Sequence, residues 1–380
     1  MGKKKPAPGL AERDQYTKFC VDMLPPSALI AVEASQAAVR ENPANRAHAS
    51  FRLPTGVAAS NLAPALALVT GKKWANGRRL KVRFLGGTVS LRQKVEAVAR
   101  QWSEFANITF DFGNHADAQI RIAFELGAGS WSAMGTDALV TSWFPPGEAT
   151  MNYGWLTADS SDADVREVVL HEFGHALGCL HEHQHPEAGI PWNRQAVIRE
   201  LSGPPNNWDA ATIEFNVFNR YTTSQTQYSQ FDPQSIMGYY VPARWTTNGF
   251  EMIPGSVMTA ADKDFIGRAY PKAGTGVLPL AVDGPQVSGS IGTTGEEDYY
   301  SFTVTNPGSH VIETTGSTDL IASLFGPNSP SNLMAEDDDS GPGLNPRIVA
   351  HLGVGTYRVM VRHYSPSGTG GYKIRVRRGS

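Results

Sequence analysis

The chain has 380 residues, of which 41% are hydrophobic and 18% charged, and its formal net charge is −3. That length is enough for two or three domains with apolar cores. The balanced charge gives no indication of nucleic-acid binding, and no apolar run is long enough to predict a membrane span. The basic start at Met1–Lys5 is not followed by the apolar segment of a secretory signal peptide, so a cytoplasmic location is not excluded.

Residues 1–75 are expected to form an N-terminal extension that precedes the first regular strands. Pro25–Val39 has partly helical apolar spacing, whereas Leu53–Val69 is apolar and interrupted by prolines. The extension contains Cys20, one of only two cysteines in the chain. A framework of several disulfides is therefore not expected.

Strand and helix patterns alternate in the next segment. Apolar residues alternate in Arg79–Leu85, Ile108–Phe112 and Gln119–Phe124, which predicts three strands. Leu91–Phe105 has the apolar spacing of one helix. We therefore predict an α+β domain over residues 76–272, with a twisted sheet and an active-site helix.

The most informative stretch is residues 171–181, which read HEFGHALGCLH. His171 and His175 are one helical turn apart, so both side chains can bind the same metal ion. A continuing helix would direct His181 away from the other two. The chain must therefore leave the helix before it, and Gly178 permits the required turn.

Glu172 follows the first histidine and is expected to lie beside the metal, not on it. Three protein ligands leave one zinc position open for water, and Glu172 can accept a proton from this zinc-activated water as general base. His183 and His185 could compete as ligands, but the motif spacing favours the third histidine of the motif. Asp162 or Asp164 is expected to cap the helix.

A second motif follows further along the chain, where residues 235–239 read SIMGY. Together with the zinc motif and Glu182 directly after it, this sequence resembles the astacin-type metzincin zinc peptidases. The resemblance implies that Met237 forms an apolar floor beneath the histidines. It also implies that Tyr239 binds zinc as a fifth ligand or swings to bind the oxyanion during turnover, and that Glu182 forms an ion pair.

The same resemblance gives roles to the flanking segments. The N-terminal extension occupies the place of a prosegment, in which Cys20 or Asp22 could plug the open zinc position as inhibitory residues do in related zymogens. The alternative is an extension that simply packs on the catalytic domain. Ser130–Ser132 and Ala149–Leu156 resemble the loop and strand before the zinc helix. One of them could be a sheet edge that pairs with an extended substrate, although an ordinary exposed edge is the alternative.

The cysteines depart from the family pattern, because the astacin disulfides are absent. Cys20 and Cys179 are far apart in the sequence, and Cys179 is expected to be a small buried apolar residue. We therefore predict a divergent member of the family.

After Tyr270 the composition changes. Residues 273–288 are expected to be a linker, and residues 289–380 an all-β sandwich, because short alternating strands recur between Gly, Pro, Asn and Ser clusters. This second part resembles the prepeptidase C-terminal domain of secreted microbial proteases, which favours an extracellular location. The acidic loop Glu336–Asp339 could supply calcium ligands together with Glu296–Asp298, although a solvated acidic turn is the commoner explanation.

The combined prediction is a secreted zinc metalloendopeptidase, made as a zymogen, that hydrolyses protein or peptide bonds with Glu172 as general base. The alternatives are a catalytically reduced zinc-bearing binding or adhesion module, and a binding protein led by the C-terminal sandwich. The sequence does not give cleavage specificity or oligomeric state.

Overall fold

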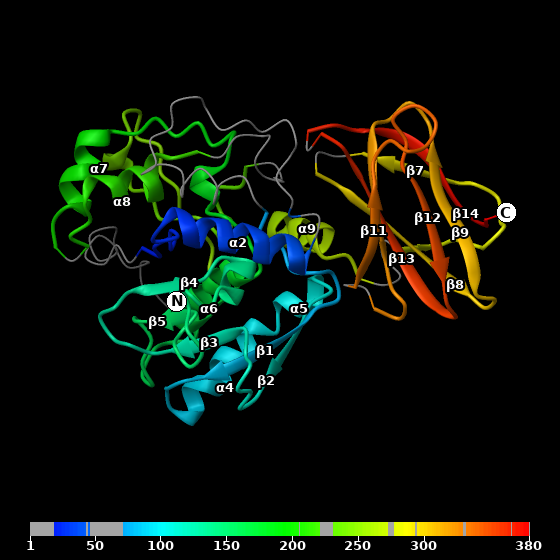
Figure 1. The fold of residues 1–380 in the computed structure, drawn as a ribbon. Coiled ribbons are helices and arrows are strands. Elements are labelled where there is room, and N and C mark those ends of the chain that lie inside the picture. Colours follow the sequence, from blue (N-terminus) through cyan, green and yellow to red (C-terminus); the bar gives the residue numbers. More distant parts are fainter. Residues whose placement is uncertain are drawn as a thin grey trace, which may run out of the picture.

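Two units lie side by side in the computed structural model, a mixed N-terminal unit and a β-sandwich drawn in yellow to red (Figure 1). No described helix is long and apolar enough to cross a membrane. The structure describes residues 19–42, 45, 71–204, 206–220, 231–272, 277–292, 295–329, 332–365 and 367–379.

A five-stranded sheet forms the centre of the N-terminal unit, with the strand order β2-β1-β3-β5-β4. β2, β1, β3 and β5 are parallel to one another, whereas β4 is antiparallel to β5 and lies at the sheet edge. The predicted α+β class is confirmed. The strands are β1 (Arg79–Phe84), β2 (Thr109–Phe112), β3 (Ile120–Ala123), β4 (Ser130–Ser132) and β5 (Met151–Tyr153).

The sequence predicts one helix after β1, but the structure has two, α4 (Val89–Ala99) and α5 (Trp102–Phe105). The N–H of Gln101 bonds to a carbonyl three residues back, which is a tighter turn than the α-helix makes. The turn carries the indole N–H of Trp102 to the carbonyl of Leu170, at 3.1 Å. A contact distant in sequence therefore accompanies the break.

The central helix α6 (Asp162–Ala176) packs against α4 and against the sheet, and its Phe173 joins the buried core of the unit. The core also contains Leu80, Trp102 and Ile122, all at most 1% exposed. The other described helical segments of this unit are α2 (Ala28–Glu41), η2 (Gly135–Leu139), α6 (Asp162–Ala176), η3 (Glu182–Gln184), α7 (Arg194–Leu201), α8 (Ala210–Ile213), η4 (Glu214–Phe218), η5 (Ala243–Trp245) and α9 (Ala260–Ala269).

The described part of the N-terminal extension packs on the catalytic unit. The side chain of Ser27 caps α2 by accepting the N–H of Ile30, and the alanine face of the helix lies against η2 and Val140. The preceding residues 19–22 continue into the site described below. Pro25–Val39 was predicted as partly helical, and α2 occupies much of that stretch, whereas Leu53–Val69 lies outside the described residues.

The C-terminal unit is a sandwich of two antiparallel-rich sheets, β11-β10-β13-β8-β6 and β12-β9-β14-β7. Their inner faces enclose a core that includes Tyr300, Leu324 and Val359. Strand pairing begins before residue 289, within the span predicted as linker. The strands are β6 (Val277–Pro279), β7 (Val287–Ile291), β8 (Glu297–Val304), β9 (Gly308–Thr315), β10 (Leu320–Phe325), β11 (Leu333–Asp337), β12 (Arg347–Leu352), β13 (Gly355–His363) and β14 (Gly370–Arg378).

Candidate metal centre and active site

Helix α6 carries two of the three predicted ligands. Its N-cap is Ser161, whose hydroxyl accepts the N–H of Asp164 at 3.1 Å. The prediction that Asp162 or Asp164 caps the helix is therefore wrong. Both aspartates lie in the first turn instead, where negative charge interacts favourably with the helix dipole.

The chain leaves α6 where the motif requires it. Gly178 has φ +90, a left-handed conformation that favours glycine. Two side chains stabilise this turn by hydrogen bonds. The indole N–H of Trp74 donates to the carbonyl of Ala176 at 2.7 Å, and the hydroxyl of Tyr270 donates to the carbonyl of Leu177 at 2.6 Å. These bonds satisfy carbonyls that the end of a helix leaves free.

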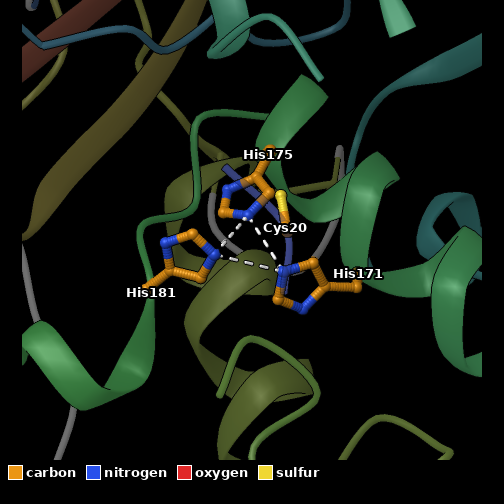
Figure 2. A group of neighbouring side chains, drawn as sticks. All are labelled: Cys20, His171, His175 and His181. Carbon is orange, nitrogen blue, oxygen red and sulfur yellow. Dashed lines mark hydrogen bonds between the residues drawn. The ribbon is translucent and has the colours of Figure 1, made fainter. Parts of the chain in front are cut away.

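The turn brings His181 back to the two histidines of α6 (Figure 2). The Nε2 atoms of His171, His175 and His181 lie 3.1 to 3.2 Å apart. Zn–N bonds of about 2.0–2.1 Å in a tetrahedral arrangement place ligand nitrogens roughly 3.3 Å apart. The observed spacing is close to that value.

The protonation of the three rings also fits a metal. Each Nδ1 faces an oxygen acceptor, namely the carbonyl of Ile236 for His171, the carbonyl of Cys179 for His175 and the carboxylate of Asp22 for His181. Nδ1 therefore carries the proton in each ring. Burial also lowers the pKa of all three imidazoles. Three unprotonated Nε2 lone pairs then face one another, an arrangement that a cation stabilises.

Glu172 lies next to Cys20 of this cluster and is fully buried. Burial raises the pKa of its carboxyl to about 8; the hydrogen bond from Cys20 lowers it and the charge of Asp22 raises it further. One carboxylate oxygen accepts the Cys20 thiol at 3.3 Å, and the other has no hydrogen-bond partner within the described part of the chain. An unpaired buried oxygen beside the imidazoles is suited to hold a water or a reacting group.

Met237 lies against α6 at Gly174. A Cβ added to Gly174 would come within 2.2 Å of the Met237 sulfur, so only glycine permits this approach. Met237 is 4% exposed and packs in the core of the unit. The sequence analysis gave Gly174 no role, although a glycine inside a helix is a signal of close packing.

Asp262 fixes the turn that carries Met237. Its carboxylate accepts hydrogen bonds from the Ser235 hydroxyl, the Ile236 N–H and the Thr259 N–H, at 2.6 to 3.1 Å. Thr259 and Asp262 form a capping box at the start of α9. Asp262 was not among the predicted site residues, although the spacing of Thr259 and Asp262 is the signature of a capping box.

Tyr239 lies beside the histidines but its hydroxyl is directed elsewhere. Its ring centroid is 4.4 Å from that of His181, and its hydroxyl donates to the backbone carbonyl of Cys20. The ring of His183 stacks on that of Tyr239, with 4.1 Å between centroids. Nε2 of His183 donates to the carbonyl of Asn216. His185 accepts the N–H of Glu187 at Nδ1. Neither of these two histidines joins the three-ring cluster.

Glu182 follows the third histidine, and its carboxylate accepts the N–H of Asp232 at 2.7 Å. Burial raises the pKa of Glu182 to about 7. The ion pair that the resemblance implied for this residue stays a prediction.

The N-terminal extension enters this site with both residues that the sequence analysis singled out. The sulfur of Cys20 and the ligand nitrogens of the three histidines all lie within 4.8 Å of one another. Asp22 is 9% exposed; its carboxylate faces His181 at 3.1 Å, and its N–H donates to the side chain of Asn216. Cys20 therefore lies together with the three imidazoles (Figure 2). The Asp22 carboxylate faces Nδ1 of His181.

Two of the acidic residues predicted as calcium ligands in the sandwich bind different partners. Asp337 accepts the N–H groups of Ser340 and Arg347, and Glu297 accepts the ammonium of Lys73. Within the described residues, the one group of side chains placed to hold a metal is the cluster with Cys20. Calcium binding by the sandwich stays a prediction.

Comparison with known proteins agrees with this geometry. A family model described as Matrixin matches residues 74–197, and a model described as Bacterial pre-peptidase C-terminal domain matches residues 296–363. No curated protein gives a significant match.

Many solved structures also match, among them the following three. "Structure of myroilysin" is 46% identical, covers 53% of this chain and 97% of that chain, and has a TM-score of 0.51. "Crystal structure of myroilysin" is 47% identical over 53% of this chain and 86% of that chain, with a TM-score of 0.43. The pre-peptidase C-terminal domain of collagenase from Bacillus anthracis is 19% identical over 26% of this chain and 93% of that chain, with a TM-score of 0.24.

The fold and the imidazole cluster thus define a zinc metallopeptidase. The chain belongs to the metzincin type of these enzymes, with a relative in myroilysin, and carries a pre-peptidase C-terminal domain behind the catalytic unit. Its substrates are accordingly proteins or peptides.

Proposed function

We propose that this chain is the latent form of a secreted zinc endopeptidase of the astacin branch. The observation that carries the proposal is the convergence of three unprotonated Nε2 atoms beside a buried carboxylate, Glu172, that has one unpaired oxygen. The SIMGY motif supports the astacin branch. The C-terminal domain, which resembles those of secreted proteases, supports export.

We assign His171, His175 and His181 as the zinc ligands. A zinc ion held there would polarise the scissile carbonyl and make a bound water more acidic. Glu172 accepts the proton of the attacking water and returns it to the leaving amine.

Tyr239 supplies the remaining part of the chemistry. When its hydroxyl is released from the carbonyl of Cys20, it can donate a hydrogen bond to the oxyanion that forms on the substrate carbonyl. In the latent form this hydroxyl is occupied. Tyr239 is therefore a group that activation makes available.

The edge strand β4 is the proposed binding surface for the substrate backbone. β4 pairs with β5 on one side only, so its other side can pair with an extended peptide. The extension runs close to this edge. Burial raises the pKa of the Cys20 thiol well above its ordinary value, and a hydrogen bond with the backbone of Ser132, in β4, lowers it in part.

Substitution of the base tests the proposed chemistry. Glu172→Ala should retain zinc in equimolar amount by elemental analysis, whereas casein hydrolysis by the activated enzyme should fall by about 10³-fold or more, since general base catalysis typically contributes 10²–10⁴. Glu167→Ala, at an exposed position of the same helix, is the matched control and should retain full activity. Retained hydrolysis in the Glu172 variant would refute its role.

The reactivity of Cys20 tests the proposed latency. With zinc bound in the full chain, the thiolate should be protected, so alkylation by iodoacetamide should be slow; a chelator should speed it by about tenfold or more. Cys179, buried and without a disulfide, is the internal control and should not respond. Equal alkylation rates of Cys20 with and without the chelator would exclude it as the plug.

A further inference from the structure

Phe19, the residue before Cys20, fills an apolar pocket beside the metal cluster. Its side chain is 4% exposed. The ring stacks on Trp245 at 5.3 Å between centroids and contacts Tyr239 at 5.1 Å and Trp208 at 5.9 Å. Three aromatic rings thus enclose a fourth, which belongs to the extension.

The site filled by Phe19 lies next to the proposed reaction centre. Tyr239 forms one wall and also lies 4.4 Å from the ring of His181. The next residue of the extension, Cys20, places its sulfur at the imidazoles and its carbonyl on the Tyr239 hydroxyl. A peptide that follows this path places one side chain in the pocket when its neighbouring residue is at the metal.

The remaining lining is apolar and buried. The carboxylate of Glu200 bonds to Arg244 and to the indole N–H of Trp245. The carboxylate of Asp22 faces His181. A charged side chain in the pocket would be desolvated without a partner, which is costly, whereas an aromatic ring gains from burial. The other buried apolar members of the cluster are Ile190, Val197, Leu201, Ile213, Val217, Val241 and Met252.

We infer that this pocket is the main specificity site of the activated enzyme, and that Phe19 holds the place of a substrate side chain in the latent form. The pocket selects an aromatic or large aliphatic residue next to the scissile bond. This inference rests on the proposed peptidase function, since it concerns the substrate of that same site.

The decisive experiment uses the full chain activated by trace trypsin and a peptide library that varies one position at a time around the scissile bond. At one position flanking the bond, Phe should exceed Ala by about 100-fold in kcat/KM, and Asp and Lys should be rejected, because burial of an aromatic side chain is a large part of the binding energy. Cleavage without any aromatic or aliphatic preference would overturn the inference while leaving the peptidase function intact. Absence of all cleavage would instead count against the proposed function.

A pocket variant identifies which residues set the preference. Trp208→Ala removes one wall at a partly exposed position, so the ratio of kcat/KM for Phe and Ala peptides should fall about tenfold. Phe84→Ala, in a separate aromatic cluster on β1, is the matched control and should leave the ratio unchanged. An unchanged ratio in the Trp208 variant would show that this pocket does not select the substrate.

A measurement on the unprocessed chain keeps the inference testable if activation fails. With zinc bound, Phe19→Leu should leave the alkylation rate of Cys20 within about threefold, whereas Phe19→Asp should raise it by tenfold or more, because a carboxylate cannot stay in the apolar pocket. Equal rates in both variants would show that the pocket does not distinguish apolar from charged side chains.

Discussion

At the scale of single residues, two glycines decide whether the three imidazoles can meet. Gly178 adopts the left-handed turn that returns His181 to the cluster. Gly174 leaves room for the Met237 sulfur against α6. Neither glycine contributes a ligand, yet each removes a steric obstacle to the site.

Replacement of Gly174 should show the cost of that contact. Gly174→Ala should lower the free energy of unfolding by about 2 kcal/mol in urea titrations, because the added methyl group overlaps Met237. Gly267→Ala, inside α9 with its nearest neighbour at 3.6 Å, is the control and should be neutral or stabilising by about 0.5–1 kcal/mol. Equal effects of the two substitutions would contradict the packing argument.

At the scale of elements, the segment of Met237 and the start of α9 together support His171, one of the proposed ligands. Asp262 binds the N–H of Ile236, and the carbonyl of Ile236 accepts Nδ1–H of His171. The helix cap and the ligand orientation are therefore connected through a single residue. Such outer contacts fix the tautomer and direction of a metal-binding histidine.

Asp262→Ala should weaken zinc binding by about 10-fold to 100-fold in competition with a chelator. The reason is that Asp262 no longer holds Ile236, whose carbonyl accepts the Nδ1–H of His171. The same variant should lose about 2 kcal/mol of stability, since three hydrogen bonds are removed. Asp264→Ala, which removes only a surface ion pair with Arg268, is the control and should change neither property measurably. Unaltered zinc affinity in the Asp262 variant would separate the cap from the metal site.

At the scale of the whole molecule, a partly buried ion pair joins the two units. The ammonium of Lys73 lies 2.7 Å from the carboxylate of Glu297, which also accepts the Tyr299 hydroxyl. Lys73 precedes Trp74, which binds the end of α6. The sandwich is therefore in contact with the segment that supports the metal-site turn.

Glu297→Gln should destabilise the protein by about 1–2 kcal/mol at pH 7, since it removes the charge partner at the partly buried ammonium of Lys73. Burial opposes ionisation, but Lys73 and Tyr299 outweigh it and lower the pKa of Glu297. The carboxylate therefore contributes fully above its unfolded pKa of about 4.3, and this contribution is lost as pH falls through the lower folded pKa.

The pH dependence gives the check. The stability difference between the natural chain and the Glu297→Gln variant should be constant from pH 7 to about 5 and should shrink towards pH 3 in urea titrations. Glu296→Gln, one residue earlier, is the control. A difference that grows on acidification would contradict the assigned ion pair.

Features that depend only on neighbouring residues in the chain could be predicted from the sequence. The helical spacing of His171 and His175 and the turn at Gly178 follow from local backbone rules, and the alternation of Arg79–Leu85 gave a strand correctly. The single helix over Leu91–Phe105 was wrong, because a contact of Trp102 with Leu170 accompanies the break in the helix.

What the sequence alone determined is the kind of chemistry, because three imidazoles and a carboxylate at that spacing are suited to a zinc site and few others. Only the tertiary structure decided which residues of the N-terminal extension lie at that site. Cys20 meets Glu172 across 152 residues, and Phe19 enters a pocket assembled from distant parts of the chain. Such contacts depend on how the elements pack, and no local pattern of residues records that packing.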